Sequence, residues 1–275
     1  MVLSFPLPLC AAFRLRETVR AIESRMDAEY ILETRGLVKE FKGFVAVSDV
    51  NLKVRKGTVH AMIGPNGAGK TTCFNLLTKF LEPTRGSIFF KGQDITREKP
   101  ADIARRGVIR SFQISAVFPH LTVLENVRIA LQRRLGSEYH FWKSHASLRT
   151  LDSRAHELLA QVGLEAQAKI VAVELPYGRK RALEIATTLA LDPELLLLDE
   201  PTQGMGHEDV DRVKNLIRTL SADRTILMVE HNMSVVADLC QCITVLQRGS
   251  VLAEGNYAEV SANPQVREAY MGSEA

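Results

Sequence analysis

A glycine-rich octapeptide constrains this chain more than any other feature of its sequence. It fits the pattern G-x-x-x-x-G-K-[ST] and lies between a β-branched run and a helical segment: Gly64-Pro65-Asn66-Gly67-Ala68-Gly69-Lys70-Thr71. Glycines let backbone N–H groups turn inward around an anion, and a helix N-terminus adds partial positive charge. The octapeptide therefore predicts a phosphate loop that binds and hydrolyses ATP. We expect Lys70 to reach the β- and γ-phosphates and Thr71 to ligate Mg²⁺, with Thr72 beside it.

The order of apolar segments predicts an α/β fold. Buried strands that alternate with helices form a largely parallel sheet covered on both faces. We expect a P-loop NTPase core with a mainly parallel sheet, an antiparallel β side sheet and a helical insertion subdomain at about residues 114–190. The expected strands are Tyr30–Phe41, Val45–Val54, Thr58–Ile63, Gly86–Phe90, Val108–Phe112, Leu195–Leu198, Thr225–Val229, Ile243–Leu246 and Ser250–Ala253. The expected helices include Gly69–Phe80, Glu208–Leu220 and Met233–Leu239.

Charge and hydropathy exclude some of the classes to which this protein could belong. The chain has 275 residues and a formal net charge of +3, and it shows no basic stripe interleaved with aromatics. We therefore expect no nucleic acid as a partner. Its apolar runs are too short to span a bilayer, so another chain must cross the membrane if the protein works there. The cysteines form neither a CxxC pair nor a zinc pattern, which indicates reduced thiols in the cytoplasm: Cys10, Cys73, Cys240 and Cys242.

Cys73 allows two interpretations. It follows the phosphate loop closely, so we expect it on the first turn of a helix, where the helix dipole lowers the pKa of a thiol. Alkylation of Cys73 would then block nucleotide binding. The alternative is an inert, packed thiol.

The first residues differ in character from the rest. The apolar stretch Val2–Phe13 has no basic segment before it and no clear cleavage site, so it makes a poor signal peptide. Met26 leads straight into the first expected strand, which suggests that it is the natural start. We expect residues 1–28 to be a disordered extension or a start-site artefact, and residues 29–275 to form the ATPase domain.

Two later apolar runs end in polar residues. Leu195–Leu198 is followed by Asp199 and Glu200, and Ile226–Val229 is followed by a glutamate and His231. In a parallel sheet the carboxyl ends of strands face the ligand. Asp199 can then hold Mg²⁺ through water, Glu200 can act as the general base for the attacking water, and His231 can donate to the γ-phosphate.

Together these segments resemble the nucleotide-binding subunit of an ABC transporter, from about Tyr30 to the C-terminus. The octapeptide is similar to Walker A and Leu195–Glu200 to Walker B. The resemblance implies that His231 is the switch histidine. It also implies that Gln113 is the Q-loop glutamine, which senses Mg²⁺ and couples to the membrane partner. Phe41 matches the aromatic that stacks on adenine, with Phe44 as the second candidate.

The segment resembling the ABC signature departs from its usual form, LSGGQ. Here it reads Leu175-Pro176-Tyr177-Gly178-Arg179. Proline replaces the serine that contacts the partner subunit's ATP, although proline suits the start of a helix. Arg179 either supplies positive charge there or faces solvent. Gly206 occupies the usual place of the D-loop aspartate, and His207, Glu208 or Asp209 either compensates or caps the next helix.

Several segments resemble the branched-chain amino acid uptake ATPases, the LivG-like type. The most distinctive is the C-terminal helix-like stretch 263–272. The resemblance implies a head-to-tail dimer with an identical or paralogous ATPase subunit. It also implies transmembrane permease subunits, docked near Phe118, His120 and Leu121, and indirect coupling to a periplasmic or extracellular solute-binding protein. The expected location is the cytoplasmic face of the inner membrane, as a peripheral subunit.

Other functions remain open at this point. The nearest alternative is the ATPase subunit of a lipid or lipopolysaccharide ABC exporter, which also has a single cassette. A metabolic P-loop kinase would need a substrate lid and would not need Leu175–Arg179 or His231. A binding module without catalysis would not need Glu200.

Overall fold

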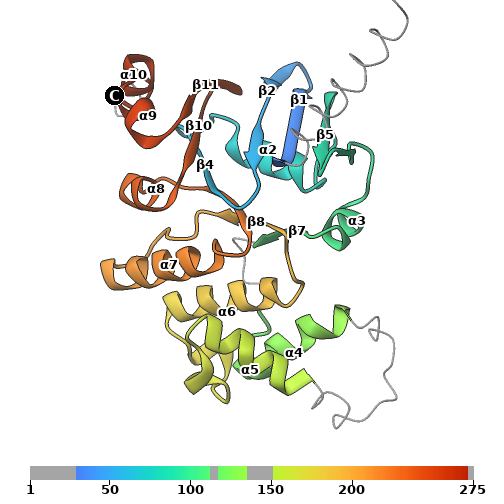
Figure 1. Ribbon diagram of the computed structural model, residues 1–275, viewed down its shortest axis with the longest axis vertical. Coiled ribbons are helices and arrows are strands. Elements are labelled where there is room, and N and C mark those ends of the chain that lie inside the picture. The colour runs from blue at the N-terminus through green and yellow to red at the C-terminus, as the bar shows by residue number, and fades with distance from the viewer. Residues whose placement is uncertain (1–28, 112–116, 135–150, 272–275) are drawn as a thin grey trace, which may run out of the picture.

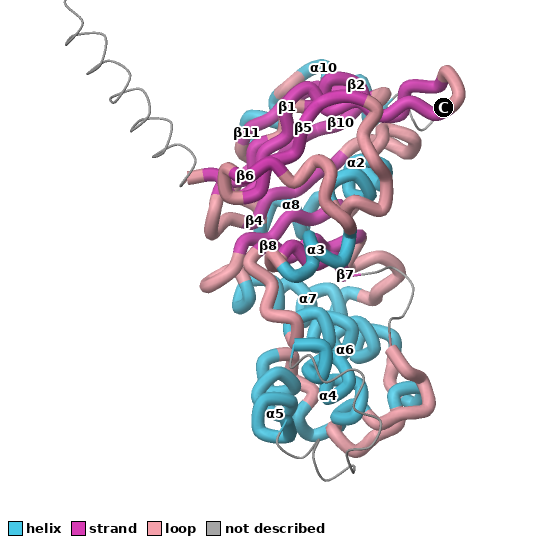
Figure 2. The backbone as a smooth tube through the Cα atoms, turned by 90° about the vertical axis from the view of Figure 1, so that its right-hand side faces the viewer, coloured by secondary structure: helices cyan, strands magenta, loops and turns pink. Residues whose placement is uncertain are grey.

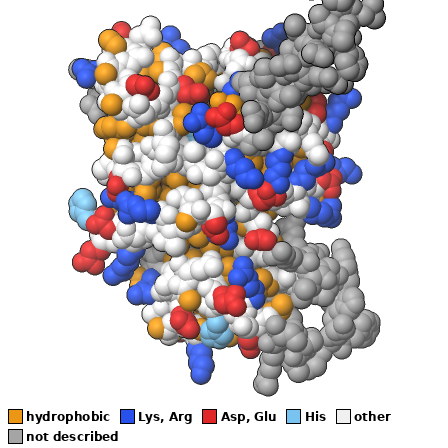
Figure 3. Space-filling model, viewed as in Figure 1, with side chains coloured by type: hydrophobic (Ala, Val, Ile, Leu, Met, Phe, Trp, Pro, Cys, Tyr) orange, Lys and Arg blue, Asp and Glu red, His pale blue; other side chains and the backbone are white. Residues whose placement is uncertain are grey.

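The computed structural model describes residues 29–111, 117–134 and 151–271. Strands fill the upper part of the molecule in Figures 1 and 2, and a group of helices lies below the main sheet. On the face shown in Figure 3, acidic and basic side chains are interspersed. Among the described helices, none combines the length and apolar character that crossing a bilayer requires.

The main sheet has six strands in the order β11-β10-β4-β9-β8-β7. All neighbours from β10 to β7 are parallel, and β11 is antiparallel to β10. Every residue of β4, β8 and β9 is buried, as expected for strands covered on both faces. The strands are β4 (Val59–Ile63), β7 (Val108–Ser111), β8 (Leu195–Asp199), β9 (Thr225–Val229), β10 (Cys242–Gln247) and β11 (Ser250–Gly255).

A second, antiparallel sheet confirms the predicted side sheet. It consists of β1 (Tyr30–Phe41), β2 (Phe44–Val50), β3 (Lys53–Arg55), β5 (Arg85–Phe90) and β6 (Gln93–Asp94). The prediction of one strand over Val45–Val54 was wrong, because that stretch forms both β2 and β3. The Thr34 hydroxyl separates them: it donates to the Val50 carbonyl and accepts from the Leu52 amide, both at 2.8 Å.

Six of the described helices lie outside the helical group that follows β7. These are α2 (Lys70–Leu77), α3 (Pro100–Arg105), α7 (His207–Leu220), α8 (Met233–Leu239), α9 (Tyr257–Ala262) and α10 (Pro264–Met271). Helix α2 ends before the predicted Phe80. The Thr78 hydroxyl donates to the Phe74 carbonyl, and Lys79 takes a positive φ of 60°, so the helix cannot continue.

A helical group follows β7. It contains α4 (Val123–Arg134), α5 (Asp152–Gln161), α6 (Tyr177–Leu189) and two 3₁₀ turns, Glu165–Gln167 and Ala172–Glu174. The apolar face of α4 is buried at Val123, Val127 and Leu131, and it packs with that of α5. These helices lie where the insertion is expected, and they extend the molecule away from the sheet (Figure 1).

Two hydrophobic cores lie on opposite faces of the main sheet. Alternate residues of a strand point to opposite faces. Accordingly, Leu196 and Leu198 of β8 join the core shared with the helical group, whereas Leu195 and Leu197 join the core shared with α2 and the side sheet. The sheet thus connects the phosphate-loop region to the helical group.

Candidate functional site

The phosphate loop leaves the sheet at the carboxyl end of β4. Strand β4 lies between β10 and β9 and is fully buried, which fixes the point at which the loop begins. The loop ends at Gly69, where α2 starts. Because the neighbouring strands are parallel, the ends of β8 and β9 lie at the same edge.

Two glycines of the loop are required by close backbone contacts. Gly64 has φ +151°, and a Cβ there would lie 2.2 Å from the Leu246 carbonyl oxygen. Gly69 has φ +99°, and a Cβ there would lie 2.6 Å from the Ala46 carbonyl oxygen. Gly67, at φ +77°, faces open space. The loop is therefore held tightly at both ends and open in the middle.

Lys70 begins α2 and points back into the loop. Its Nζ donates to the carbonyl oxygens of Gly64 at 2.7 Å and Pro65 at 3.0 Å. Burial lowers the pKa of the Lys70 ammonium, and the charges of Glu200 and Asp199 oppose that shift. The three charged groups therefore share one region of the site.

The start of α2 suits a bound phosphate. Gly69 occupies the N-cap and gives the helix no side-chain cap, and the first turn contains no acidic residue. Thr71 is exposed and Thr72 half-buried in this turn, and the nearby middle of the loop is open at Asn66 and Gly67. A polyphosphate fits this combination of N–H groups, helix dipole and ammonium.

The structure brings Glu200 and His231 together. Glu200 Oε1 and His231 Nε2 are 2.8 Å apart, although the two residues follow different strands. Glu200 has φ +46°, a conformation that costs energy for a residue with a Cβ. The backbone bond from the Glu200 amide to the Val229 carbonyl, 2.9 Å long, holds it there. Strain of this kind is concentrated at functional sites.

Glu230 is a site residue that the sequence analysis did not identify. It is 2 % exposed. Its carboxylate accepts bonds from the backbone amides of Thr202, His231 and Asn232 and from the Thr202 hydroxyl. It ties the segment after β8 to the turn after β9, and so fixes where Glu200 and His231 meet. Its place directly before His231 was the only available signal.

Two arginines that were also not identified hold Asp199. Arg110 of β7 forms a buried ion pair with the Asp199 carboxylate. Arg181 of α6 donates to the Asp199 backbone carbonyl at 2.8 Å and pairs with Glu184 at 2.7 Å. The predicted metal residue is therefore fixed from two sides.

The signature-like segment forms the start of α6, as predicted. Pro176 is the N-cap, and Tyr177 is 62 % exposed. Gly178 is buried against α7, since a Cβ there would lie 2.5 Å from the Asp209 carboxyl carbon. Arg179 donates to the Gly163 carbonyl at 3.3 Å and to the Gln167 side chain at 3.0 Å. In the single chain, the Arg179 guanidinium therefore hydrogen-bonds to other residues of the same chain.

The alternative in which His207, Glu208 or Asp209 caps the next helix was wrong, because the N-cap has no side-chain bond, and compensation for the D-loop aspartate stays a prediction. Gly206 is the N-cap of α7, and Glu208 and Asp209 lie in the first turn, where acidic residues stabilise a helix. Asp209 is also the residue that contacts Gly178.

Other predicted site residues lie at the periphery or outside the described part. Phe41 and Phe44 flank the exposed turn between β1 and β2, and they are 41 % and 67 % exposed. The Lys39 ammonium lies 5.0 Å from the centre of the Phe41 ring. Gln113, Cys10 and the expected extension at residues 1–28 lie outside the described residues.

Of the two interpretations of Cys73, the structure supports the packed thiol. Its side chain is completely buried in the core beside α2, and burial raises its pKa to about 12. Desolvation of the thiolate outweighs the helix dipole here. Cys73 is the packed thiol of the second interpretation.

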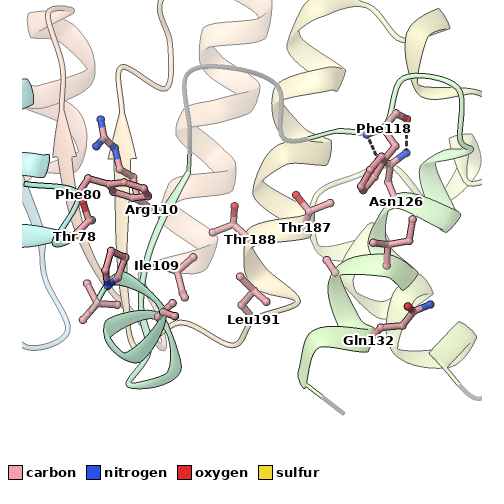
Figure 4. Close-up of a pocket in the computed structure, with 16 residues that line it drawn as sticks. Thr78, Phe80, Ile109, Arg110, Phe118, Asn126, Gln132, Thr187, Thr188 and Leu191 are labelled. Carbon is pink, nitrogen blue, oxygen red and sulfur yellow. Dashed lines mark hydrogen bonds between the residues drawn. The ribbon is translucent and has the colours of Figure 1, made fainter. Parts of the chain in front are cut away.

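A groove separates the sheet region from the helical group (Figure 4). Its volume is about 730 Å³, and its walls include Phe80, Arg110, Phe118, Asn126 and Thr188. Asn126 fixes the segment that carries Phe118, because it accepts from the Phe118 amide at 2.7 Å and donates to the Phe118 carbonyl at 3.1 Å. Phe118 is 51 % exposed.

The C-terminal helix contacts the phosphate loop. Tyr270 of α10 hydrogen-bonds the backbone of Gly64, and burial raises the pKa of its hydroxyl to about 12. A cavity of about 540 Å³ lies between Asn66 and Gly67 of the loop and Gln265 and Glu268 of α10.

A phosphate loop before a helix, with a carboxylate and a histidine after two neighbouring strands of the same sheet, defines a P-loop ATPase. The chain belongs to the ABC transporter family, whose ATP-binding domain matches residues 47–203. Proteins of this family hydrolyse ATP to power transport. A second family, described as branched-chain amino acid ATP-binding cassette transporter, matches residues 250–275.

Similar proteins agree with this assignment. The chain is 40 % identical to the high-affinity branched-chain amino acid transport ATP-binding protein BraF of Pseudomonas aeruginosa, over 88 % of this chain and 98 % of BraF. It is 38 % identical to LivG of Escherichia coli, a protein of the same description, over the same shares. Among solved structures, an ATP-binding cassette of an ABC transporter in its ADP conformation has a TM-score of 0.78 and 31 % identity, over 88 % of this chain and 99 % of that one.

Proposed function

We propose that this chain is the ATP-hydrolysing subunit of an importer for branched-chain amino acids or a similar small solute. The observation that carries the proposal is the Glu200–His231 pair at the edge of the sheet that also carries the phosphate loop. The match of residues 250–275 and the names of the relatives support uptake over the export of lipid or lipopolysaccharide.

The described residues suggest how ATP is held. The backbone N–H groups of Gly64–Thr71 and the Lys70 ammonium would bind the phosphates, and Lys70 would exchange its two carbonyl partners for phosphate oxygens. Phe41, exposed at the tip of β1, would offer its ring to adenine. Mg²⁺ prefers oxygen ligands, which Thr71, Asp199 and Gln113, the last of them outside the described residues, would supply, and when bound it would neutralise charge on the phosphates.

Glu200 acts as the general base for hydrolysis in this proposal. Its carboxylate accepts a proton from the attacking water, and His231 fixes its orientation through the 2.8 Å contact. His231 is 41 % exposed at its side chain, so it can also reach a γ-phosphate. Glu230 keeps both residues in place.

A second subunit completes the site. The start of α6, Pro176–Arg179, lies apart from the phosphate loop (Figure 1), so it would serve the ATP of a partner cassette, identical or paralogous. One structural relative, 25 % identical with a TM-score of 0.69, is a dimeric ATP-binding cassette bound to ADP and phosphate. Arg179 would have to leave Gln167 to contact the partner's nucleotide.

The permease would dock in the groove between the sheet and the helical group. The groove is largely apolar at Phe80, Ile109 and Phe118, and His120 and Leu121 follow on the same loop. In this proposal the chain would lie on the cytoplasmic face of the inner membrane, where the permease would link it to a solute-binding protein on the other side.

Uptake by the reconstituted complex tests the proposal. The chain, its permease and its binding protein are placed in vesicles with ATP inside, and labelled leucine is added outside. We expect ATP-dependent accumulation that stops when F118D prevents docking, while S261D, a change on the distant helix α9, has no effect. ATP hydrolysis without leucine or other amino acid uptake would contradict the assigned solute class.

A further inference from the structure

Arg110 lies where three segments of the site meet. It belongs to β7, which pairs in parallel with β8. Its Nη2 donates to the Asp199 carboxylate, and its Nη1 donates to Asn75 Oδ1 at 2.5 Å. The guanidinium also lies 5.7 Å from the centre of the Phe74 ring. Figure 4 shows Arg110 at the wall of the groove, beside Phe80 and Thr78.

The partners of Arg110 belong to the elements that carry the expected Mg²⁺ ligands. Asn75 follows Thr71 by one turn of α2, so both lie on the same face of that helix. Asp199 ends β8. The side chain of Arg110 is 10 % exposed and that of Asp199 is 2 % exposed, so the bonds are shielded from water. The planar guanidinium can make both bonds at once, which an ammonium on a flexible stem does less well.

We propose that Arg110 is a positioning residue for the divalent-cation site. It holds the Asp199 carboxylate at a fixed distance from the helix that carries Thr71. The inference rests on the proposed function, because it concerns the Mg²⁺ of bound nucleotide. Partners of this kind behind metal ligands orient the ligand and raise metal affinity.

A purely structural ion pair would behave differently from a positioning residue. Loss of a structural pair lowers stability and weakens every property of the site alike. Loss of a positioning residue weakens the contribution of the metal more than the binding of the nucleotide itself. The ratio between nucleotide affinity with Mg²⁺ and nucleotide affinity without it distinguishes the two.

The test measures that ratio with a fluorescent ADP analogue, in excess Mg²⁺ and in EDTA, on the full-length chain. In R110M we expect the Mg²⁺-dependent gain in affinity to fall by roughly tenfold or more, with a change of less than about threefold in EDTA. R110K should recover part of the gain. N75A, which removes only one anchor, should lose less than R110M. R106M is the matched control, because Arg106 forms an exposed ion pair with Glu98 outside the site.

Each other result overturns the inference. An unchanged Mg²⁺ gain, a larger gain, or equal losses with and without Mg²⁺ in R110M would contradict it. If circular dichroism shows that R110M does not fold, the same affinity ratio is measured for R110K and N75A, and those two variants decide the question. A wild-type chain that binds the analogue without any gain from Mg²⁺ also refutes it, whereas a wild-type chain that binds no nucleotide refutes the proposed function instead.

Discussion

The phosphate loop and the start of α6 are built in opposite ways. The loop is fixed within the chain: Gly64 and Gly69 touch the backbone of neighbouring segments, and Lys70 bonds back to the loop. The start of α6, Pro176–Arg179, exposes Tyr177. Its charged side chain, Arg179, hydrogen-bonds to a nearby carbonyl and a glutamine. The first region is complete on its own, and the second presents a surface. Under the proposed function, the first region would bind nucleotide within one chain, and the second would act on the nucleotide of another chain.

A substitution of Glu200, the proposed general base, should have the largest effect on hydrolysis and should leave nucleotide binding nearly unchanged. In E200Q we expect hydrolysis to fall by about 10²–10⁴-fold, because the amide cannot accept the proton from water. Nucleotide affinity should change by less than about threefold. Phosphate release and fluorescence binding measure the two properties, and E157Q, an exposed position on α5, is the control. Residual hydrolysis within tenfold of the wild type would show that Glu200 is not the base.

A series of glycine substitutions tests how firmly the loop is fixed. G64A should lower the free energy of unfolding by about 3 kcal/mol or more, because its Cβ meets the Leu246 carbonyl. G67A faces open space but keeps a positive φ, so about 1 kcal/mol is expected. G206A, with an ordinary φ of −73° and no near neighbour, should cost little. Urea unfolding gives all three values, and a different order would contradict the strain argument.

Acid should lower the stability of the folded chain through His60, which lies in β4, the strand that leads into the phosphate loop. Burial lowers the pKa of His60 to about 4, whereas an unperturbed histidine titrates at 6.5. Between these values the unfolded chain binds a proton that the folded chain excludes. The contribution to stability is therefore complete above pH 6.5 and is lost as the pH falls toward 4, by about 3 kcal/mol.

Comparison with H60Q isolates this contribution to stability. The variant loses the titrating ring and should show a shallower fall in stability between pH 6.5 and 4.5, measured by urea unfolding. The His60 Nε2 contact with Thr244, 2.7 Å long, is lost as well, so the slope with pH and not the absolute stability decides. Equal slopes in both proteins would exclude His60 as the titrating group.

The smallest expected effect concerns the second region. R179A removes two polar contacts that are partly exposed, so the free energy of unfolding should fall by about 1 kcal/mol. Nucleotide affinity of the isolated chain should not change. Q167A removes one of the same contacts and should cost less. Weaker nucleotide binding by R179A in the isolated chain would show that the two regions are not independent.

Features with a local cause were predicted from the sequence. Thr225–Val229 and Met233–Leu239 form the expected strand and helix at the expected bounds, because a buried apolar run and a capping asparagine mark them. The strand ends at Asp199, Glu200 and His231 were also expected from the alternation of strands and helices. The glycines of the loop follow from its motif.

Features that depend on contacts between distant segments were not predicted. The Arg110–Asp199 pair and the bonds of Glu230 join residues that only the folded sheet brings together. For Cys73 the sequence left two interpretations open, because its position on the helix was foreseen and its complete burial was not. The division of Val45–Val54 into two strands depends on one hydroxyl of the facing strand.

The strand order has a consequence for the synthesis of this protein. Strand β4, which carries the phosphate loop, pairs with β9 and β10, which the ribosome makes much later, and Gly64 is bonded to Tyr270 near the end of the chain. The nascent loop therefore has neither of its neighbouring strands until most of the polypeptide has emerged. A chain that stops before β9 lacks both of the strands that flank β4, and with them the backbone partners that fix where the phosphate loop begins.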